Sequence, residues 1–138
     1  MRALKLDCRN AMWNGKPINE KLVLVVDDDR SVRESLSGLL DLKGYSVLEA
    51  ENGQTALDVL EKAAHFPCLI LLDLAMPIMD GHGFLKLRAE HPMLRQIPVV
   101  VVSGNLRGGE PLNGINAYLQ KPVRFDRLIA IVDLAASS

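Results

Sequence analysis

Three short runs of the 138-residue sequence are apolar at every position: Leu22–Val26, Leu69–Leu72 and Val99–Val102. A strand that is apolar on both faces is typical of a parallel sheet that helices cover on each side. Two further strands are predicted at Tyr45–Ala50 and Ala117–Leu119, each shorter or less uniformly apolar. The sequence therefore favours a five-stranded parallel sheet over an antiparallel one.

Segments with apolar residues at helical spacing separate most of these strands. We expect helices at Arg30–Leu42, Gln54–Ala64, Gly83–Glu90 and Arg124–Ala135. In the first, Ser31 followed three residues later by Glu34 predicts a capping box. In the last, Phe125 is expected to face the core together with Leu128, Ile129 and Val132.

The alternation of strands and helices predicts an α/β fold with a doubly wound, flavodoxin-like sheet. Right-handed crossovers restrict the topology, and the strand order 2-1-3-4-5 is the common solution. Residues 105–114 depart from the pattern, because they hold three glycines and a proline where a fourth helix is due. These residues disfavour a helix interior, so we expect that helix to be short, irregular or absent.

Length and composition are those of one globular domain, which we place at residues 21–138 with residues 1–20 as an N-terminal extension. The formal net charge of −1 offers no general attraction to nucleic acid. Two cysteines, Cys8 and Cys68, do not make a disulfide framework and fit a reducing cytoplasm. No apolar stretch approaches the roughly 20 residues of a membrane helix. We therefore expect a cytoplasmic protein without membrane contact.

Polar side chains follow the predicted strands at one edge of the sheet. The first strand ends in Asp27-Asp28-Asp29, the third in Asp73 and the fourth in Ser103, and Lys121 follows the fifth. In doubly wound sheets, ligands bind at the carboxyl ends of the strands, where the strand order reverses. The fold prediction alone therefore brings acids, a hydroxyl and an ammonium group together.

Carboxylates held close together repel one another and are tolerated when a divalent cation binds them. Oxygen ligands without nearby His or Cys favour Mg²⁺, or the similar Mn²⁺. A carboxylate such as Asp73 can act as a nucleophile toward a phosphoryl group, whose charge Lys121 would offset. The third acid, Asp29, fits better as a charge at the N-terminus of the following helix.

Four segments carry the most specific pattern: VLVVDDD (23–29), LILLDLAMPIMDG (69–81), VVVVSG (99–104) and YLQKP (118–122). Together they resemble the receiver domains of two-component response regulators. The resemblance spans nearly all of residues 21–136, and the set is far more specific than any one segment.

The resemblance implies a role for each matching residue. Asp73 would accept the phosphoryl group, while Asp28, Asp27 and the main-chain carbonyl of Ala75 would join it in holding the cation, Asp28 more directly than Asp27. Ser103 and Lys121 would contact the phosphoryl group. Ser103 would also be the switch hydroxyl, and Tyr118 would be the switch aromatic, or alternatively a buried structural tyrosine. The Lys121–Pro122 peptide bond is expected to be cis.

As a receiver, the chain is expected to be a phosphoacceptor signalling domain and not an enzyme. Its partners would be a histidine kinase or histidine phosphotransfer protein and a downstream protein target, with the chain a monomer or weak homodimer. We expect a single-domain regulator without DNA binding of its own. Alternatives are a receiver excised from a hybrid kinase or a larger regulator, a receiver degenerated into a binding module, and a haloacid-dehalogenase-type phosphohydrolase. The last requires an aspartate where Ala75 stands.

Overall fold

The computed structural model describes residues 12–13, 16–104 and 115–136. In chain order the elements are β1 (Met12–Trp13), β2 (Lys16–Val26), α2 (Arg30–Leu42), β3 (Ser46–Ala50), α3 (Gly53–Lys62), β4 (Phe66–Leu72), α4 (Gly81–Glu90), the 3₁₀-helix η1 (Leu94–Gln96), β5 (Val99–Ser103), β6 (Ala117–Gln120) and α5 (Phe125–Ala136).

Five parallel strands form the body of the sheet in the order β3-β2-β4-β5-β6. This is the predicted order 2-1-3-4-5, which is thereby confirmed. The reversal of strand order falls between β2 and β4, because the chain moves from β2 outward to β3 and then back to β4 on the other side. The carboxyl ends of β2 and β4 are therefore neighbours at the point where such sheets bind ligands.

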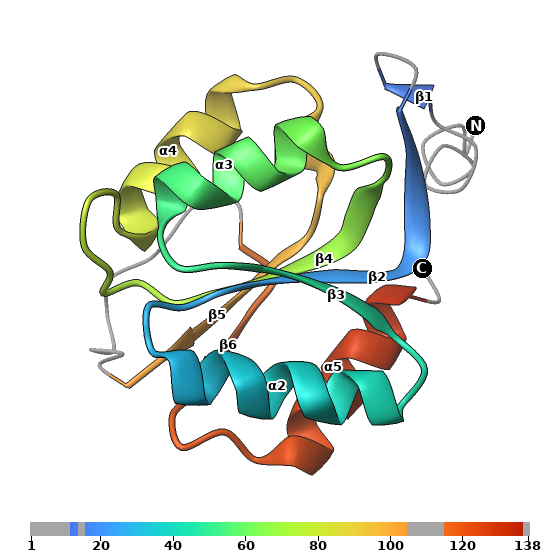
Figure 1. The fold of residues 1–138 in the computed structure, drawn as a ribbon, viewed down its shortest axis with the longest axis vertical. Coiled ribbons are helices and arrows are strands. Elements are labelled where there is room, and N and C mark those ends of the chain that lie inside the picture. The colour runs from blue at the N-terminus through green and yellow to red at the C-terminus, as the bar shows by residue number, and fades with distance from the viewer. Residues whose placement is uncertain (1–11, 14–15, 105–114, 137–138) are drawn as a thin grey trace.

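Helices cover both faces of the sheet, with α3 and α4 on one side and α2 and α5 on the other (Figure 1). Successive residues of each strand point to opposite faces. In β2, Leu24 and Val26 pack into the core under α3 and α4, whereas Val23 and Val25 pack into the core over α2 and α5. Burial on both faces is the reason that the central strands are apolar throughout.

Strand β2 begins at Lys16, six residues before the apolar run that predicted it. Its first residues pair with β1 and with the start of β4. The ammonium group of Lys16 donates to the main-chain oxygens of Leu60 and Glu61, at 2.6 and 2.8 Å, and lies over the ring of Phe66. Residues 16–20, placed by the sequence in the extension, thus continue the sheet and cap the C-terminal end of α3.

Two local predictions are wrong, and one lies outside the described residues. The N-cap of α2 is Asp29, whose side chain accepts from the main-chain N–H groups of Ser31 and Val32, so no Ser31–Glu34 capping box begins this helix. Phe125 is 49% exposed, because as the first residue of α5 it precedes the turn that reaches the core. The irregular fourth helix was expected at residues 105–114, which the structure does not describe.

No helix in the described part of the chain is long and apolar enough to cross a membrane.

Glycine is required at one junction beside the site. A Cβ atom on Gly81 would lie 2.5 Å from the main-chain oxygen of Asp73 and 2.7 Å from the Cα atom of Leu74. We expect Gly81→Ala to lower the free energy of unfolding by about 1–3 kcal/mol, because the backbone must shift to admit the methyl group. Urea denaturation measures the change.

Gly38, in the middle of α2, is the matched control, because a Cβ there would meet no atom within 4 Å. Gly38→Ala should raise the free energy of unfolding by about 0.5–1 kcal/mol through helix propensity. Equal effects of the two substitutions would contradict the steric account.

Candidate functional site

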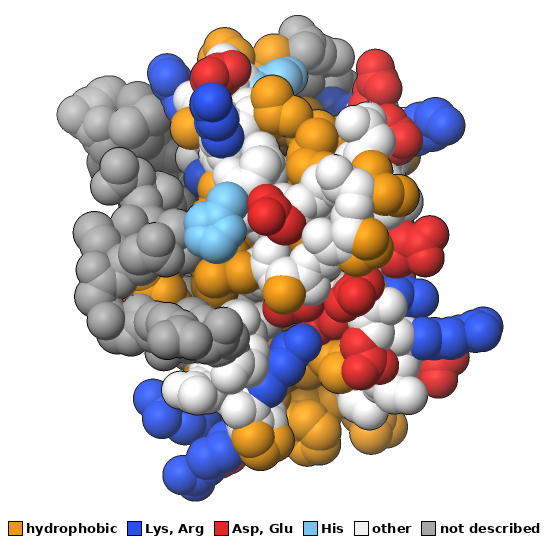
Figure 2. All heavy atoms as spheres, turned by 90° about the vertical axis from the view of Figure 1, so that its left-hand side faces the viewer, with side chains coloured by type: hydrophobic (Ala, Val, Ile, Leu, Met, Phe, Trp, Pro, Cys, Tyr) orange, Lys and Arg blue, Asp and Glu red, His pale blue; other side chains and the backbone are white. Residues whose placement is uncertain are grey.

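The predicted polar residues lie together at the carboxyl edge of the sheet. Asp27 and Asp28 follow β2, Asp73 follows β4, Ser103 ends β5 and Lys121 follows β6. Figure 2 faces this edge and shows acidic side chains beside a basic one near the middle of the surface. Residues separated by up to 94 positions in the chain thus meet in one place.

Three carboxylates form the centre of the site. Asp27, Asp28 and Asp73 each offer an oxygen atom, and these atoms all lie within 4.8 Å of one another. Asp27 and Asp73 are buried, whereas Asp28 is exposed. The ammonium group of Lys121 lies 2.6 Å from Oδ2 of Asp27 and 3.7 Å from Oδ1 of Asp73. The ammonium group of Lys121 therefore bridges the two buried acids.

Strand pairing places the two buried acids side by side. The main-chain N–H of Asp73 donates to the carbonyl of Val26, at 2.9 Å, so the end of β4 is tied to the end of β2. On the other side of β2, the N–H of Asp27 donates to the carbonyl of Ala50 in β3, at 3.1 Å. Both acids are thus the first residues beyond the paired part of adjacent strands.

Asp29 has a different task from its two neighbours. Its carboxylate caps α2, and its own N–H donates to Oδ1 of Asp27 at 2.9 Å. The sequence expectation that Asp29 serves the helix N-terminus is confirmed.

The charges of the site disfavour the ionised form of Asp73. Burial, followed by the negative charge of Asp27, raises the pKa of Asp73 from 3.8 to about 6, and Asp28 adds to the effect. Lys121 and a main-chain hydrogen bond from Ala75 act in the opposite direction. The metal-free site therefore has an unfavourable excess of negative charge.

Lys121 is adapted to this environment. Burial by itself lowers the pKa of its ammonium group, but the hydrogen bond and charge of Asp27 outweigh burial, so the pKa is raised overall. The lysine stays protonated beside the acids.

The loop that follows Asp73 is tightly closed. Gly81 N–H donates to the carbonyl of Leu74, and Gly53 N–H, at the start of α3, donates to the carbonyl of Met79. Between them, Met79 N–H donates to the carbonyl of Pro77 across Ile78, whose φ is 68°. A β-branched residue in such a γ-turn is strained, and Ile78 is also 85% exposed. The sequence analysis did not single out Ile78.

Ser103 and Tyr118 differ in exposure. Ser103 is buried at the end of β5, where its carbonyl accepts from the main-chain N–H of Lys121 at 3.0 Å. Tyr118, on β6, is 42% exposed, so the alternative of a buried structural tyrosine is wrong. The peptide bond between Lys121 and Pro122 is cis.

Arg33 is a residue of this site that the sequence did not indicate. Its Nη1 atom donates to the main-chain oxygen of Asp27 at 2.7 Å. An arginine in an amphipathic helix is usually predicted to lie on the solvent-exposed face. Its position one turn after the three aspartates was the available signal, but only the fold shows the contact.

The donor set suits a small hard cation. The three clustered groups are all carboxylates, and oxygen ligands of this kind favour Mg²⁺ or Mn²⁺ over the metals that bind His and Cys. A divalent ion would also offset the repulsion that, in addition to burial, raises the pKa of Asp73. The residues present therefore fit such an ion.

Residues 23–133 match the family model of the response regulator receiver domain. This chain belongs to that family. The match covers all four segments that carried the resemblance, and the receiver domain is the phosphoacceptor module of two-component signal transduction. The alternative of a phosphohydrolase is thereby set aside.

Curated relatives agree with the family. The receiver domain is 38% identical over 113 residues to "Response regulator MprA" of Mycolicibacterium vanbaalenii, covering 78% of this chain and 47% of that protein. It is 36% identical over 115 residues to "Response regulator Rre1" of Synechocystis sp., covering 80% of this chain and 49% of that protein. The chain thus spans about half the length of the curated relatives that it matches.

Solved structures share the fold. The receiver domain of a signal transduction histidine kinase from Syntrophus aciditrophicus has a TM-score of 0.77 and 27% identity, over 85% of this chain and 90% of that one. The chemotaxis response regulator CheY4 of Vibrio cholerae has a TM-score of 0.73 and 27% identity, over 83% of this chain and 97% of that one. Receivers from a kinase and from a chemotaxis protein are therefore similar to it.

Replacing Asp73 by Asn should stabilise the metal-free receiver at neutral pH. Between pH 3.8 and about 6, Asp73 is protonated in the folded protein but ionised in the unfolded chain. The contribution of Asp73 to stability therefore falls as the pH rises through this window. At pH 7, Asp73→Asn should raise the free energy of unfolding by about 1–3 kcal/mol, with no gain below pH 3.8.

Urea denaturation in EDTA at several pH values measures this effect. Asp58→Asn, on the exposed surface of α3, is the control and should change stability by less than about 0.5 kcal/mol. A destabilised Asp73→Asn protein at pH 7 would refute the charge-crowding account.

Proposed function

We propose that Asp73 accepts a phosphoryl group from the phosphohistidine of a histidine kinase or histidine phosphotransfer protein. A carboxylate oxygen of Asp73 attacks phosphorus, the bond from phosphorus to the histidine nitrogen breaks, and the imidazole leaves with its electron pair. The observation that carries the proposal is the convergence of Asp27, Asp28 and Asp73 within 4.8 Å beside Lys121. Membership of the receiver family supports it.

Asp28, Asp27, Asp73 and the main-chain carbonyl of Ala75 would hold Mg²⁺ or Mn²⁺ in this proposal. When bound, the cation offsets negative charge on the acids and on the incoming phosphoryl oxygens. Lys121 supplies a further positive charge, and its ammonium group, 3.7 Å from Oδ1 of Asp73, lies close enough to meet a phosphoryl oxygen. The buried position of Asp73 keeps competing water scarce around the nucleophile.

Ser103 and Tyr118 would convert phosphorylation into a change of surface. The aspartyl phosphate offers three acceptor oxygens beyond the original carboxylate. We assign the Ser103 hydroxyl, at the end of β5, as a donor to one of them. Movement of β5 toward the phosphate would shift β6, which pairs with it at Val101 and Tyr118, and so bias the exposed tyrosine between two positions.

The switched surface would bind a downstream protein in the cytoplasm. The formal net charge of −1 and the scattered basic residues support a protein target over a nucleic acid. The single-domain arrangement and the monomeric or weakly dimeric state stay predictions.

Incubation with a small phosphodonor such as phosphoramidate and Mg²⁺, followed by intact-mass measurement, tests the proposal. The wild-type protein should gain the mass of one phosphoryl group, and EDTA should prevent the gain. Asp73→Asn should gain nothing, because an amide does not act as the nucleophile.

Asp80→Asn is the matched control. Asp80 lies in the loop after Asp73 and caps α4 through Gly83 N–H, a task that asparagine performs equally well. This variant should be phosphorylated as the wild type is. Equal gains by wild type and Asp73→Asn would show that the central assignment is wrong.

A further inference from the structure

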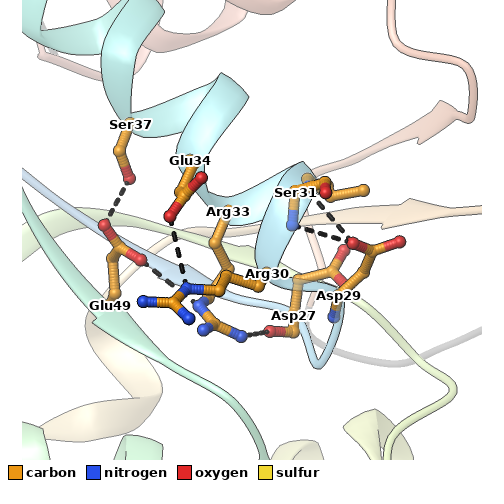
Figure 3. A network of polar contacts seen from close by, with 9 residues as sticks. Asp27, Asp29, Arg30, Ser31, Arg33, Glu34, Ser37 and Glu49 are labelled. Carbon is orange, nitrogen blue, oxygen red and sulfur yellow. Dashed lines mark hydrogen bonds and ion pairs between the residues drawn. The ribbon is translucent and has the colours of Figure 1, made fainter.

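Arg33 reaches from α2 to the edge of the acidic site (Figure 3). Its side chain is 15% exposed, and its Nη1 atom donates to the main-chain oxygen of Asp27 at 2.7 Å. That carbonyl belongs to the first residue beyond β2, where the paired strand has ended. Because Asp27 is buried, its carbonyl needs a partner from the protein, and Arg33 supplies one.

The guanidinium group is also held from its other side. Its Nε atom lies 3.2 Å from Oε1 of Glu49, on β3. The second oxygen of Glu49 accepts from the Ser37 hydroxyl at 3.0 Å, one turn further along α2 (Figure 3). The fork of Arg33 is therefore fixed between a helix and the sheet.

With this contact, every polar group of Asp27 has a partner. Its N–H donates to Ala50, and its Oδ1 accepts from the N–H of Asp29. Its Oδ2 accepts from Lys121, and its carbonyl accepts from Arg33. Four hydrogen bonds thus orient Asp27. The bond from Arg33 is the one to the Asp27 carbonyl, the group directly bonded to Asp28.

Planarity of the peptide bond extends this control to the next residue. The carbonyl of Asp27 and the N–H of Asp28 share one rigid plane. A donor that fixes the carbonyl therefore fixes the direction in which the chain leaves Asp27 and the place from which the Asp28 side chain starts. Asp27 and Asp28, two of the three clustered acids, lie on either side of this plane.

We propose that Arg33 is a positioning residue for the divalent-cation site, acting through the Asp27–Asp28 peptide plane. It is not one of the residues that would hold the cation, and the inference rests on the function proposed above for this site. Arginine is needed because its planar fork donates to Asp27 and to Glu49 in two directions at once. A lysine carries the same charge on a single nitrogen and does not reproduce this geometry.

Arg30 is the control that distinguishes a positioning role of Arg33 from the effect of its positive charge alone. It carries the same charge on the same helix, three residues earlier, but it is 81% exposed and pairs with Glu34 at 3.3 Å. Arg30→Met thus removes one positive charge near the acids and leaves the Asp27 carbonyl contact in place.

Calorimetric titration with Mg²⁺ of the wild type, Arg33→Met, Arg33→Lys and Arg30→Met tests the proposal. Both Arg33 variants should bind Mg²⁺ about tenfold more weakly, the low end of the range for groups that orient metal ligands. Arg30→Met should stay within about threefold of the wild type, because an exposed charge contributes little. Circular dichroism confirms that each variant is folded at the titration temperature.

Two readouts distinguish positioning from a loss of stability. In the metal-free protein, amide hydrogen exchange at Asp29 should quicken in Arg33→Met, because the backbone that carries its acceptor, Oδ1 of Asp27, loses its contact with Arg33. Phosphorylation by phosphoramidate should be slow in this variant at low Mg²⁺ and return to near the wild-type rate at saturating Mg²⁺. A purely structural role would lower the melting temperature and change neither readout.

Mg²⁺ affinities of the Arg33 variants within about threefold of the wild type would overturn the proposal, since positioned ligands depend more strongly than that on their supports. So would full rescue by Arg33→Lys, because charge alone would then suffice. A wild-type protein with no saturable Mg²⁺ binding would instead contradict the proposed function, and the positioning role with it.

Discussion

The crowding of three carboxylates around one lysine is the interaction on which this site depends. Asp27 and Asp73 are buried and bridged by Lys121, and Asp28 completes the cluster from the surface. One ammonium group does not balance three acids, and burial together with the negative charges of Asp27 and Asp28 raises the pKa of Asp73 to about 6 without metal. The imbalance is what makes the site receptive to a divalent cation, and it makes the metal-free fold less stable than its core would allow.

The fold supplies the crowding through strand order. Reversal of the order between β2 and β4 makes their carboxyl ends neighbours. The hydrogen bond from the N–H of Asp73 to the carbonyl of Val26 fixes the register of the two strand ends. This much could be predicted from the sequence, because doubly buried strands are apolar throughout and an acid at the end of such a strand stands out. The helix-capping role of Asp29 followed from the same position in the chain.

Other features could not be read from the sequence, for identifiable physical reasons. Apart from Ile18, the first residues of β2 are polar or proline, so they show no strand pattern, yet pairing with β1 and β4 extends the strand to Lys16. Phe125 is apolar at helical spacing, but it lies at the very start of α5, before the turn that reaches the core. The role of Arg33 depends on Glu49, which only the pairing of β3 with β2 brings near.

Carboxyl-carbon NMR of Asp73 as a function of pH tests the central claim, that the acids form a mutually repelling cluster suited to a cation. In EDTA, one carboxyl signal should titrate at about pH 6 and be absent from Asp73→Asn. Saturating Mg²⁺ should move that titration to lower pH, because the cation competes with the proton. An Asp73 that titrates near its ordinary value of 3.8 and ignores Mg²⁺ would contradict the account.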